Sequence, residues 1–378
     1  MTTAASWKFD CITDWETIWS ESFQKQWMEW METDTESHIF FHPALVKAWV
    51  ETYLPLRRLE PRFLVARQGE STVFLPLVLW RRNWKNAWQR LLIPAGYSDF
   101  DYHDPIRVGP ANGSRLGDFW SAFIGEISAG TETKNVDRLL LPGLRTGATA
   151  DGSLVETGET CLACQLEDYP NSEAFLSSLK RSVRHAIRRQ IRRMNEQGPL
   201  HYRVYDADQE DSAMNALPLF LKAHARRWPR AYRAPGLHAA LLREGLRAGV
   251  AHFSELRVGD QPISWRFVFF YKRRLYSYIS AFLENYAILS PSTVHRFFCL
   301  QYALEKKKAL IYDLLRGDEN YKHDWADHSV PLYALHWKSD GLGSRLRNGW
   351  VEVVKPRTAK LVRQCVAPAI AQESAEGL

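Results

Sequence analysis

The 378-residue sequence has few cysteines: five, at positions 11, 161, 164, 299 and 365. These are too few and too scattered to form the disulfide framework of a secreted scaffold. Cys161 and Cys164 form a lone C-x-x-C pair, and no second pair or nearby histidine completes the four ligands that a structural zinc ion needs. We therefore predict no metal site.

Long apolar runs are also absent. No stretch reaches the roughly 18 consecutive apolar residues that a bilayer-spanning helix requires. The segment Met1–Asp10 lacks the basic and then apolar pattern of a secretory signal. Hydrophobic residues make up 46% of the chain and charged residues 24%, which excludes a disordered or fibrous protein. We expect a soluble, cytoplasmic protein without a transmembrane segment.

Acidic residues are absent from residues 180–193, which contain seven lysines and arginines. Since the net charge of the chain is +6, the remainder sums to −1. Apolar residues at spacings of three and four from Phe175 to Met194 predict one helix, capped near Asn171 and ended by Gly198. The basic side of this helix, residues 181–193, is either a solvated face or a surface for a phosphorylated ligand, a polyanion or a membrane.

Strand and helix patterns alternate in both halves of the sequence. Three strands at 252–257, 262–270 and 274–280 have short connections typical of an antiparallel meander. A helix to about residue 308 and a strand at 310–315 follow. We predict an α/β (α+β) fold with two similar domains, each a mixed, mostly antiparallel sheet flanked by helices. The predicted boundaries are 1–160 and 161–345, followed by a peripheral helix and tail over 346–378.

One spaced motif lies in the segment 311–325, IYDLLRGDENYKHDW. It fits the pattern D-x-x-x-G-x-x-x-Y-K-x-x-W/F at Asp313, Gly317, Tyr321, Lys322 and Trp325. This segment resembles the strand-end motif of the GNAT-like acetyltransferases of the CelD/BcsL type, bacterial proteins of cellulose and exopolysaccharide synthesis. Weaker similarities to the same family lie at 38–49, 179–193 and 224–228.

The resemblance covers about residues 37–337 and implies a relation to the Fem-type aminoacyltransferases, with two tandem GNAT-like domains. It also implies that acetyl-CoA or another acyl-CoA is the co-substrate, bound in the C-terminal domain. The implied reaction is acyl transfer to an amine or hydroxyl of a carbohydrate or amino-sugar acceptor in envelope polysaccharide synthesis. The implied location is the cytoplasm or the periphery of the inner membrane.

By this resemblance, the donor lies beside the strand that carries Tyr278 and at the start of the helix after it. GNAT enzymes usually hold the donor pyrophosphate with a glycine-containing loop, but residues 290–296 contain no glycine. Free amides at Ser290, Ser292 and Thr293, with the charge of Arg296, can still bind an anion. Because glycine would ease close backbone approach to a phosphate, coenzyme A and a different acyl carrier both stay open as donors.

Asp313 and Lys322 are the predicted catalytic pair. Asp313 ends an apolar strand, where it is either a general base in a partly dry pocket or a cap for the loop that begins at Gly317. The sequence leaves three roles open for Lys322. It is a clamp for an oxyanion or phosphate, an ion-pair partner of Asp313 or Asp318, or a surface residue. We predict that the two side chains face one shared cavity.

The acceptor site is predicted from residue types and spacing. His224, Arg227 and Trp228 share one face at the end of a helix, as a sugar-binding wall or as a helix C-cap. Tyr321 is predicted to form a wall of the site. The polar loop near residue 100 is interpreted as an acceptor loop of the N-terminal domain. The predicted acceptor-binding residues are His224, Arg227, Trp228, Tyr321, Asp99 and Asp101.

Two other functions remain open. In the first, the chain is a non-catalytic module that binds a polyanion or membrane surface through the basic helix. In the second, it is a Fem-like aminoacyl-tRNA-dependent transferase that binds the RNA on that helix. A polyanion-binding module would bind with a steep dependence on ionic strength and show no turnover.

Overall fold

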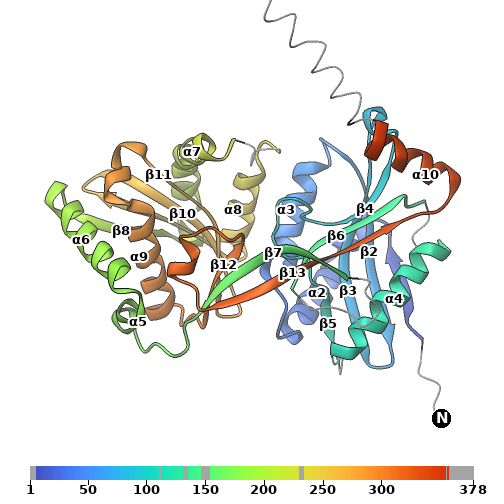
Figure 1. The fold of residues 1–378 in the computed structure, drawn as a ribbon, viewed down its shortest axis with the longest axis horizontal. Helices are drawn as coiled ribbons and strands as arrows, with labels where there is room; N and C mark the ends of the chain where they lie inside the picture. Colours follow the sequence, from blue (N-terminus) through green and yellow to red (C-terminus); the bar gives the residue numbers. More distant parts are fainter. Residues whose placement is uncertain are drawn as a thin grey trace, which may run out of the picture.

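The computed structural model describes residues 6–109, 113–130, 135–145, 154–229, 234–354 and 356. Its N-terminal half is a mixed α/β unit (Figure 1). Asp14 and Ser20 cap its first two helices through their side chains. The elements are β1 (Lys8–Ile12), α1 (Trp15–Trp19), α2 (Glu21–Thr33), α3 (Pro43–Tyr53), β2 (Arg58–Gln68), β3 (Ser71–Arg81), β4 (Arg90–Pro94), β5 (Ile106–Val108), α4 (Gly113–Ala129) and β6 (Arg138–Leu144).

The C-terminal half contains the predicted meander, formed by β9, β10 and β11. Short turns at 259–260 and 272–273 connect these strands. The elements are β7 (Leu154–Gln165), α5 (Ser172–Ser178), α6 (Arg181–Gln197), β8 (Leu200–Tyr205), α7 (Glu210–Arg227), α8 (Leu237–Arg247), β9 (Ala251–Val258), β10 (Gln261–Tyr271), β11 (Arg274–Phe282), α9 (Pro291–Glu305), β12 (Ile311–Arg316), β13 (His328–Lys338), α10 (Leu342–Gly349) and a π-helical turn (Trp350–Val354).

The basic segment forms two helices where one was predicted. Asn171 caps α5 as expected, because its Oδ1 accepts a hydrogen bond from the Ala174 amide at 2.9 Å. Leu179 and Lys180 then adopt extended backbone, and α6 starts at Arg181. Ile187 and Met194 of α6 are buried as the apolar stripe predicts, so the charged side of α6 faces outward.

All strands join one sheet, in the order β1-β2-β3-β4-β6-β13-β7-β12-β11-β10-β9-β8, with β5 paired to β3 off this path. The two halves exchange strands at its centre. Strand β7 follows β6 in the chain but pairs with β12, whereas β13 follows β12 but pairs with β6. The two exchanged strands also pair with each other and run between the halves in Figure 1.

This exchange bears on the predicted domains. The fold class is confirmed, because each half contributes a mixed part of the sheet, flanked by helices. The boundary at residue 160 falls inside β7 and stays a prediction. Helix α10 and the π-helical turn after it span Leu342 to Val354, across the predicted start of the C-terminal segment. Residues 357–378 of the predicted helix and tail lie outside the described residues, so this boundary also stays a prediction.

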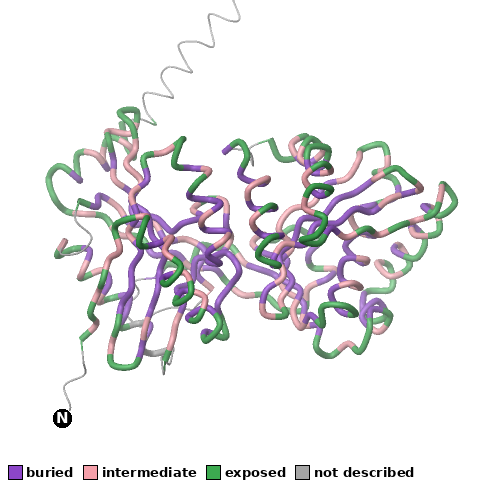
Figure 2. The backbone as a smooth tube through the Cα atoms, turned by 180° about the vertical axis from the view of Figure 1, so that it is seen from behind, coloured by how far each residue is buried: buried purple, intermediate pink, exposed green. Residues whose placement is uncertain are grey.

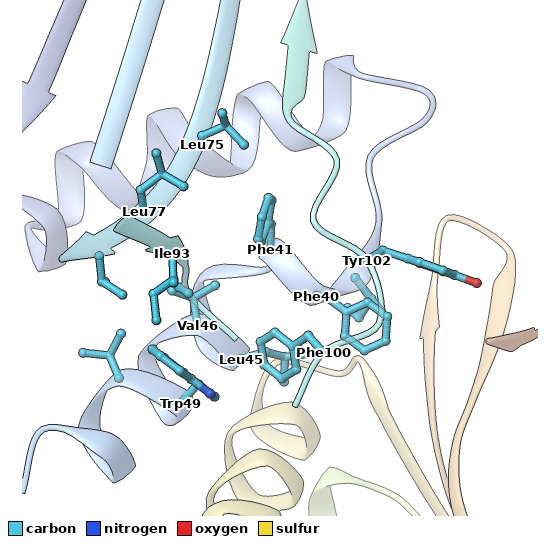
Figure 3. Packing of buried hydrophobic residues seen from close by; sticks show 14 of the residues in the cluster. Phe40, Phe41, Leu45, Val46, Trp49, Leu75, Leu77, Ile93, Phe100 and Tyr102 are labelled. Atoms are coloured by element: carbon cyan, nitrogen blue, oxygen red, sulfur yellow. The ribbon is translucent and has the colours of Figure 1, made fainter. Parts of the chain in front are cut away.

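Aromatic side chains fill the core between the halves. Figure 2 shows the buried backbone following the strands of both halves. Phe40 and Tyr102 of the N-terminal half pack at a centroid distance of 5.7 Å, and Phe40 also contacts Tyr276 of β11 at 6.0 Å. In Figure 3 the hydroxyl of Tyr102 points away from the N-terminal core toward the strands of the other half. The loop that carries Tyr102 is thereby fixed against the C-terminal half.

Candidate functional site

A cleft opens where β11 and β12 separate. These parallel strands pair over only three positions, from Arg274 with Ile311 to Tyr276 with Asp313. Leu315 has a φ of 62°, a left-handed conformation that a branched side chain rarely adopts, and the pairing of β12 with β7 shifts register at the same point. The backbone of β12 therefore turns away from β11, and residues 277–282 and 314–316 line the resulting space.

Two adjoining cavities, of about 820 and about 600 Å³, occupy this space. We refer to them together as the cleft, because they share seven lining residues: His224, Arg227, Trp228, Ser280, Arg296, Glu319 and Tyr321. Each has the size of a site for a small molecule or cofactor. The shared residues come from α7, β11, α9 and the loop after β12, so all of these elements shape the same site.

The four residues predicted at the helix start all line the cleft: Ser290, Ser292, Thr293 and Arg296. Helix α9 begins at Pro291, and Ser290 before it has a φ of 48°. The side chain of Ser290 makes no capping hydrogen bond to the first turn. The positive end of the helix dipole therefore faces the cleft without a side-chain cap, which favours an anion there.

One buried guanidinium group, that of Arg296, lines the cleft, and a second, that of Arg266, lies behind its wall. Arg296 is 5% exposed and lies over the ring of Tyr321, 4.3 Å from the centroid. Arg266 of β10 is 1% exposed and donates through Nη1 to Ser277 Oγ, which is part of the cleft wall, at 3.1 Å. The Nε of Arg296 and the Nε and Nη2 of Arg266 have no hydrogen-bond partner among the described residues.

Burial lowers the pKa of Arg296, because its positive charge loses solvation. Neither Arg266 nor Arg296 forms an ion pair within the described part of the chain. Buried charges without partners are costly, and an anionic ligand would offset that cost. The part of the cleft that Arg296 lines is therefore suited to a negatively charged group.

The end of α7 also borders the cleft. His224, Arg227 and Trp228 line both cavities, so the structure brings these predicted residues to the site, and their role as an acceptor wall stays a prediction. Burial lowers the pKa of His224 to about 4, so this imidazole is neutral at neutral pH. Tyr321 also lines both cavities, and Tyr278 lines the smaller one.

Asp101 reaches the cleft from the N-terminal half. It lines the smaller cavity together with Tyr278 and Lys322. Its side chain is 21% exposed, and Oδ1 lies 3.6 Å from Nε of Arg316. Burial raises the pKa of Asp101 to about 6, although Arg316 and Lys322 act in the opposite direction. A carboxyl group with such a pKa is mostly ionised at neutral pH and can accept a proton.

The backbone at Asp101 is held by a close approach to Gly143. A Cβ at Gly143 would lie 2.2 Å from the carbonyl oxygen of Asp101, and the glycine has a φ of 69°. Only glycine fits both conditions. Asp99, predicted to share the site, is not among the residues that line the cleft. Its Oδ2 accepts a hydrogen bond from the indole of Trp49 at 2.9 Å.

Asp313 does not open into the cleft. Its Oδ1 accepts hydrogen bonds from the Tyr102 hydroxyl and the Leu315 amide, both at 2.8 Å, and its Oδ2 accepts one from Arg274 at 3.2 Å. Of the described cavities it lines only a separate one of about 280 Å³, where strands of both halves meet. The alternative that Asp313 binds the backbone of the following loop is the one that agrees with this geometry.

Lys322 holds the other side of the same turn. Its ammonium donates to the carbonyls of Leu315, Arg316 and Gly317 at 3.3, 2.7 and 3.3 Å, and it pairs with Glu319 at 2.9 Å. Lys322 lines the cleft, whereas Asp313 lines the other cavity, so the predicted shared cavity is wrong for the cavities described. The backbone of β12 separates the two groups.

Two charged residues of the site were missed from the sequence. Arg266 lies in a strand that is otherwise mostly apolar, and a lone arginine inside a buried meander was a signal that could have been used. Glu319 lies within the recognised motif but was assigned no role, because the motif pattern leaves its position open. Only the fold shows that it faces the cleft.

Residues 181–323 match the sequence family described as an acetyltransferase (GNAT) domain. This part of the C-terminal half therefore matches a GNAT acyltransferase domain. The chain also resembles solved structures. FemX superposes with a TM-score of 0.59 at 9% identity, over 82% of this chain and 95% of FemX. The C-terminal domain of a putative lysylphosphatidylglycerol synthetase from Agrobacterium fabrum gives 0.50 at 11% identity, over 86% and 95%.

At these identities the likeness concerns the fold alone, and it agrees with the predicted arrangement of two GNAT-like halves. A search among curated proteins found no match for the acyltransferase. Among its described helices, none is long and apolar enough to cross a membrane. The described residues also contain no group of three or more histidine, cysteine, aspartate or glutamate side chains arranged to hold a metal ion.

Proposed function

We propose that the enzyme transfers an acyl group from a thioester carrier, most simply acetyl-CoA, to an amine or hydroxyl of a carbohydrate or amino-sugar acceptor. One observation carries the proposal. The parallel strands β11 and β12 diverge beside an open helix start, above a buried and unpaired arginine. An elongated donor with anionic groups fits this cleft. The resemblance of the 311–325 motif to the CelD/BcsL type supports a role in envelope polysaccharide synthesis.

The reaction requires few protein groups. The acceptor attacks the thioester carbonyl, a C–N or C–O bond forms, the C–S bond breaks, and the thiolate leaves. The acceptor must lose one proton, and a positioned base typically contributes a factor of about 10²–10⁴ to the rate. Asp101 is the carboxylate in the cleft that is suited to take this proton. Trp228, which is half exposed on the wall, offers an apolar face on which a sugar ring can stack.

Asp313 and Lys322 act through the backbone in this mechanism. Asp313 binds the amide of Leu315 and Lys322 binds its carbonyl, so together they fix the left-handed turn that opens the cleft. We assign them positioning roles in place of the predicted direct catalysis. Their replacement is expected to lower stability and rate together.

The test measures thiol release and product mass with a panel of acyl-CoAs and of amino-sugar and sugar acceptors. Turnover with at least one donor is expected. Arg296→Gln is expected to raise the KM for the donor by about tenfold or more, the usual effect of losing a charged contact. The matched control is Arg203→Gln, since the exposed Arg203 stacks on Tyr205 and does not line the cleft. No turnover with any thioester, or an unchanged KM in Arg296→Gln, would overturn the proposal.

A second function is favoured by the exposed arginines of α6. Arg188 pairs with Glu173 and Lys180 with Asp324, but the exposed side chains of Arg181, Arg189 and Arg192 form no ion pair among the described residues. We propose that this face binds a polyanion such as RNA. Fluorescence anisotropy with labelled RNA should show affinity that falls steeply with salt and weakens when these three arginines become glutamine. An affinity for RNA that changes neither with salt nor with the three substitutions would refute this function.

A further inference from the structure

Large apolar side chains gather on the surface at one end of the N-terminal half, which we call the apolar end. Two loops, α10 and the π-helical turn after it form this surface. Trp84 and Trp88, between β3 and β4, are 65% and 69% exposed, and Leu342 and Leu346 of α10 are 81% and 72% exposed. Of the fourteen exposed large hydrophobic residues in the described chain, nine belong here: Leu54, Leu56, Trp84, Trp88, Leu342, Leu346, Trp350, Val353 and Val354. Such a concentration indicates a contact surface.

Specific hydrogen bonds join these segments into one surface. Gln89 donates to Asn348 of α10 at 2.7 Å, and both side chains are buried. The carboxylate of Asp137 accepts from Arg90 and from Arg347, which links β4 to α10. Figure 1 shows α10 beside β4 at the end of the molecule opposite to α6. The exposed side chains are therefore presented by a fixed framework.

A cavity lined almost entirely by arginine lies within the apolar end. It measures about 260 Å³, and its wall is formed by Arg58, Arg81, Arg82, Arg90, Arg347 and Trp88. Their acidic partners are Glu60, for Arg58 and Arg81, and Asp137, for Arg90 and Arg347. Five guanidinium groups against two carboxylates leave three positive charges in excess. The Nε of Arg82 is buried without a hydrogen-bond partner among the described residues.

We infer that the apolar end docks on a membrane surface that contains anionic phospholipids. The indoles and leucines would enter the headgroup region, and a lipid phosphate would enter the arginine cavity. Tryptophan suits this depth because it has an apolar body and a polar N–H, and cations beside it are attracted to anionic headgroups.

The charges favour a membrane over a second copy of the chain. Two copies meeting through this surface would bring together two excesses of positive charge, which repel. The inference does not depend on the transferase chemistry, because none of these residues lines the cleft. It also differs from membrane binding through the basic helix, since α6 lies at the opposite end (Figure 1).

The experiment uses the full-length protein and sedimentation with two vesicle types, phosphatidylcholine alone and phosphatidylcholine mixed with phosphatidylglycerol. Binding to the mixed vesicles, with a blue shift of tryptophan fluorescence, is expected. The double variant Trp84→Ala, Trp88→Ala is expected to lower the partition coefficient by about tenfold or more. The matched control is Ile288→Ala, because Ile288 is 72% exposed in the C-terminal half and lines neither cavity of the cleft. Arg82→Gln is expected to reduce the preference for anionic vesicles.

The remaining outcomes identify other occupants and refute the inference. Thermal stabilisation by inorganic phosphate without vesicle binding would show a site for a free anion. A wild-type dimer that becomes a monomer in the double variant, again without vesicle binding, would show a contact between copies. Equal binding to both vesicle types would remove the headgroup role. The rate of thiol release without lipid should be unchanged in the double variant. A failure of the membrane inference would therefore leave the proposed acyl transfer standing, and a failure of the proposed acyl transfer would leave the membrane inference standing.

Discussion

Asp101 offers the sharpest test of the site, because the raised pKa that suits it to accept a proton also changes the stability of the protein with pH. Its pKa of about 6 in the folded protein stands above the 3.8 of an unperturbed aspartate. The folded state therefore binds the Asp101 proton more tightly than the unfolded state does. The contribution of Asp101 to the unfolding free energy is therefore fully present below pH 3.8 and decreases as the pH rises to about 6. Above that pH the protein stays less stable.

The expected magnitude follows from the shift. A rise of the pKa from 3.8 to about 6 means that the ionised Asp101 lowers the unfolding free energy by about 3 kcal/mol at neutral pH. Asparagine resembles the protonated acid and carries no such cost. The variant Asp101→Asn should therefore be more stable than the wild type at pH 7.5, by up to about 3 kcal/mol, and equally stable near pH 4.

Urea unfolding at a series of pH values measures this difference, and initial rates of thiol release measure the chemistry. The rate of the variant should fall by about 10²-fold or more if Asp101 accepts the proton. The matched control is Asp99→Asn, from the same loop but outside the cleft, which should keep the pH dependence of both quantities. A variant that keeps its rate, or whose stability relative to the wild type does not change with pH, would refute the reasoning.

Three further changes test the polar contacts that hold the fold together, two of them beside the cleft and one at the apolar end. Lys322→Met removes the ammonium from three carbonyls and should lower the unfolding free energy by about 2–4 kcal/mol, with a parallel loss of turnover; normal stability with lost turnover would instead restore a direct catalytic role. Asp137→Asn leaves two arginines unpaired and should cost about 3–5 kcal/mol in thermal or urea unfolding. Because these partners hold the pKa of Asp137 below its usual range, the stabilisation is present at neutral pH and lost in acid, so the gap between wild type and variant should shrink as the pH falls; a constant gap would contradict the ion pairs. Tyr102→Phe removes a hydrogen bond to Asp313 between the halves and should cost about 1–2 kcal/mol; additivity with Asp313→Asn would show that the two groups do not interact.

The parts of the site that were predictable depend on local patterns. The helix start at Ser290 and the helix end at Trp228 follow from turn residues and periodicity over a few positions, and both line the cleft. The meander follows from alternation and short connections. The cap of α5 was also predictable, because asparagine at position 171 is a favoured N-cap residue and caps the helix as expected.

The parts that were not predictable depend on single dihedrals and on distant pairings. Leu315 has a positive φ, which nothing about leucine signals, and this turn decides which way Asp313 and Lys322 point. The break between α5 and α6 at Leu179 contains neither glycine nor proline. Asp101 was predicted as an acceptor-binding residue, but its raised pKa follows from burial between segments far apart in the chain, which local patterns do not encode.

The exchange of β7 and β13 has a consequence for biosynthesis. The ribosome completes β6 nearly two hundred residues before it completes β13, the strand that pairs with β6 along one edge. Until then that edge carries unsatisfied amides and carbonyls, and an uncovered edge invites pairing with another nascent chain. A gene fragment that stops after residue 160 would make this exposure permanent. Such a fragment should aggregate unless the remaining half is co-expressed with it.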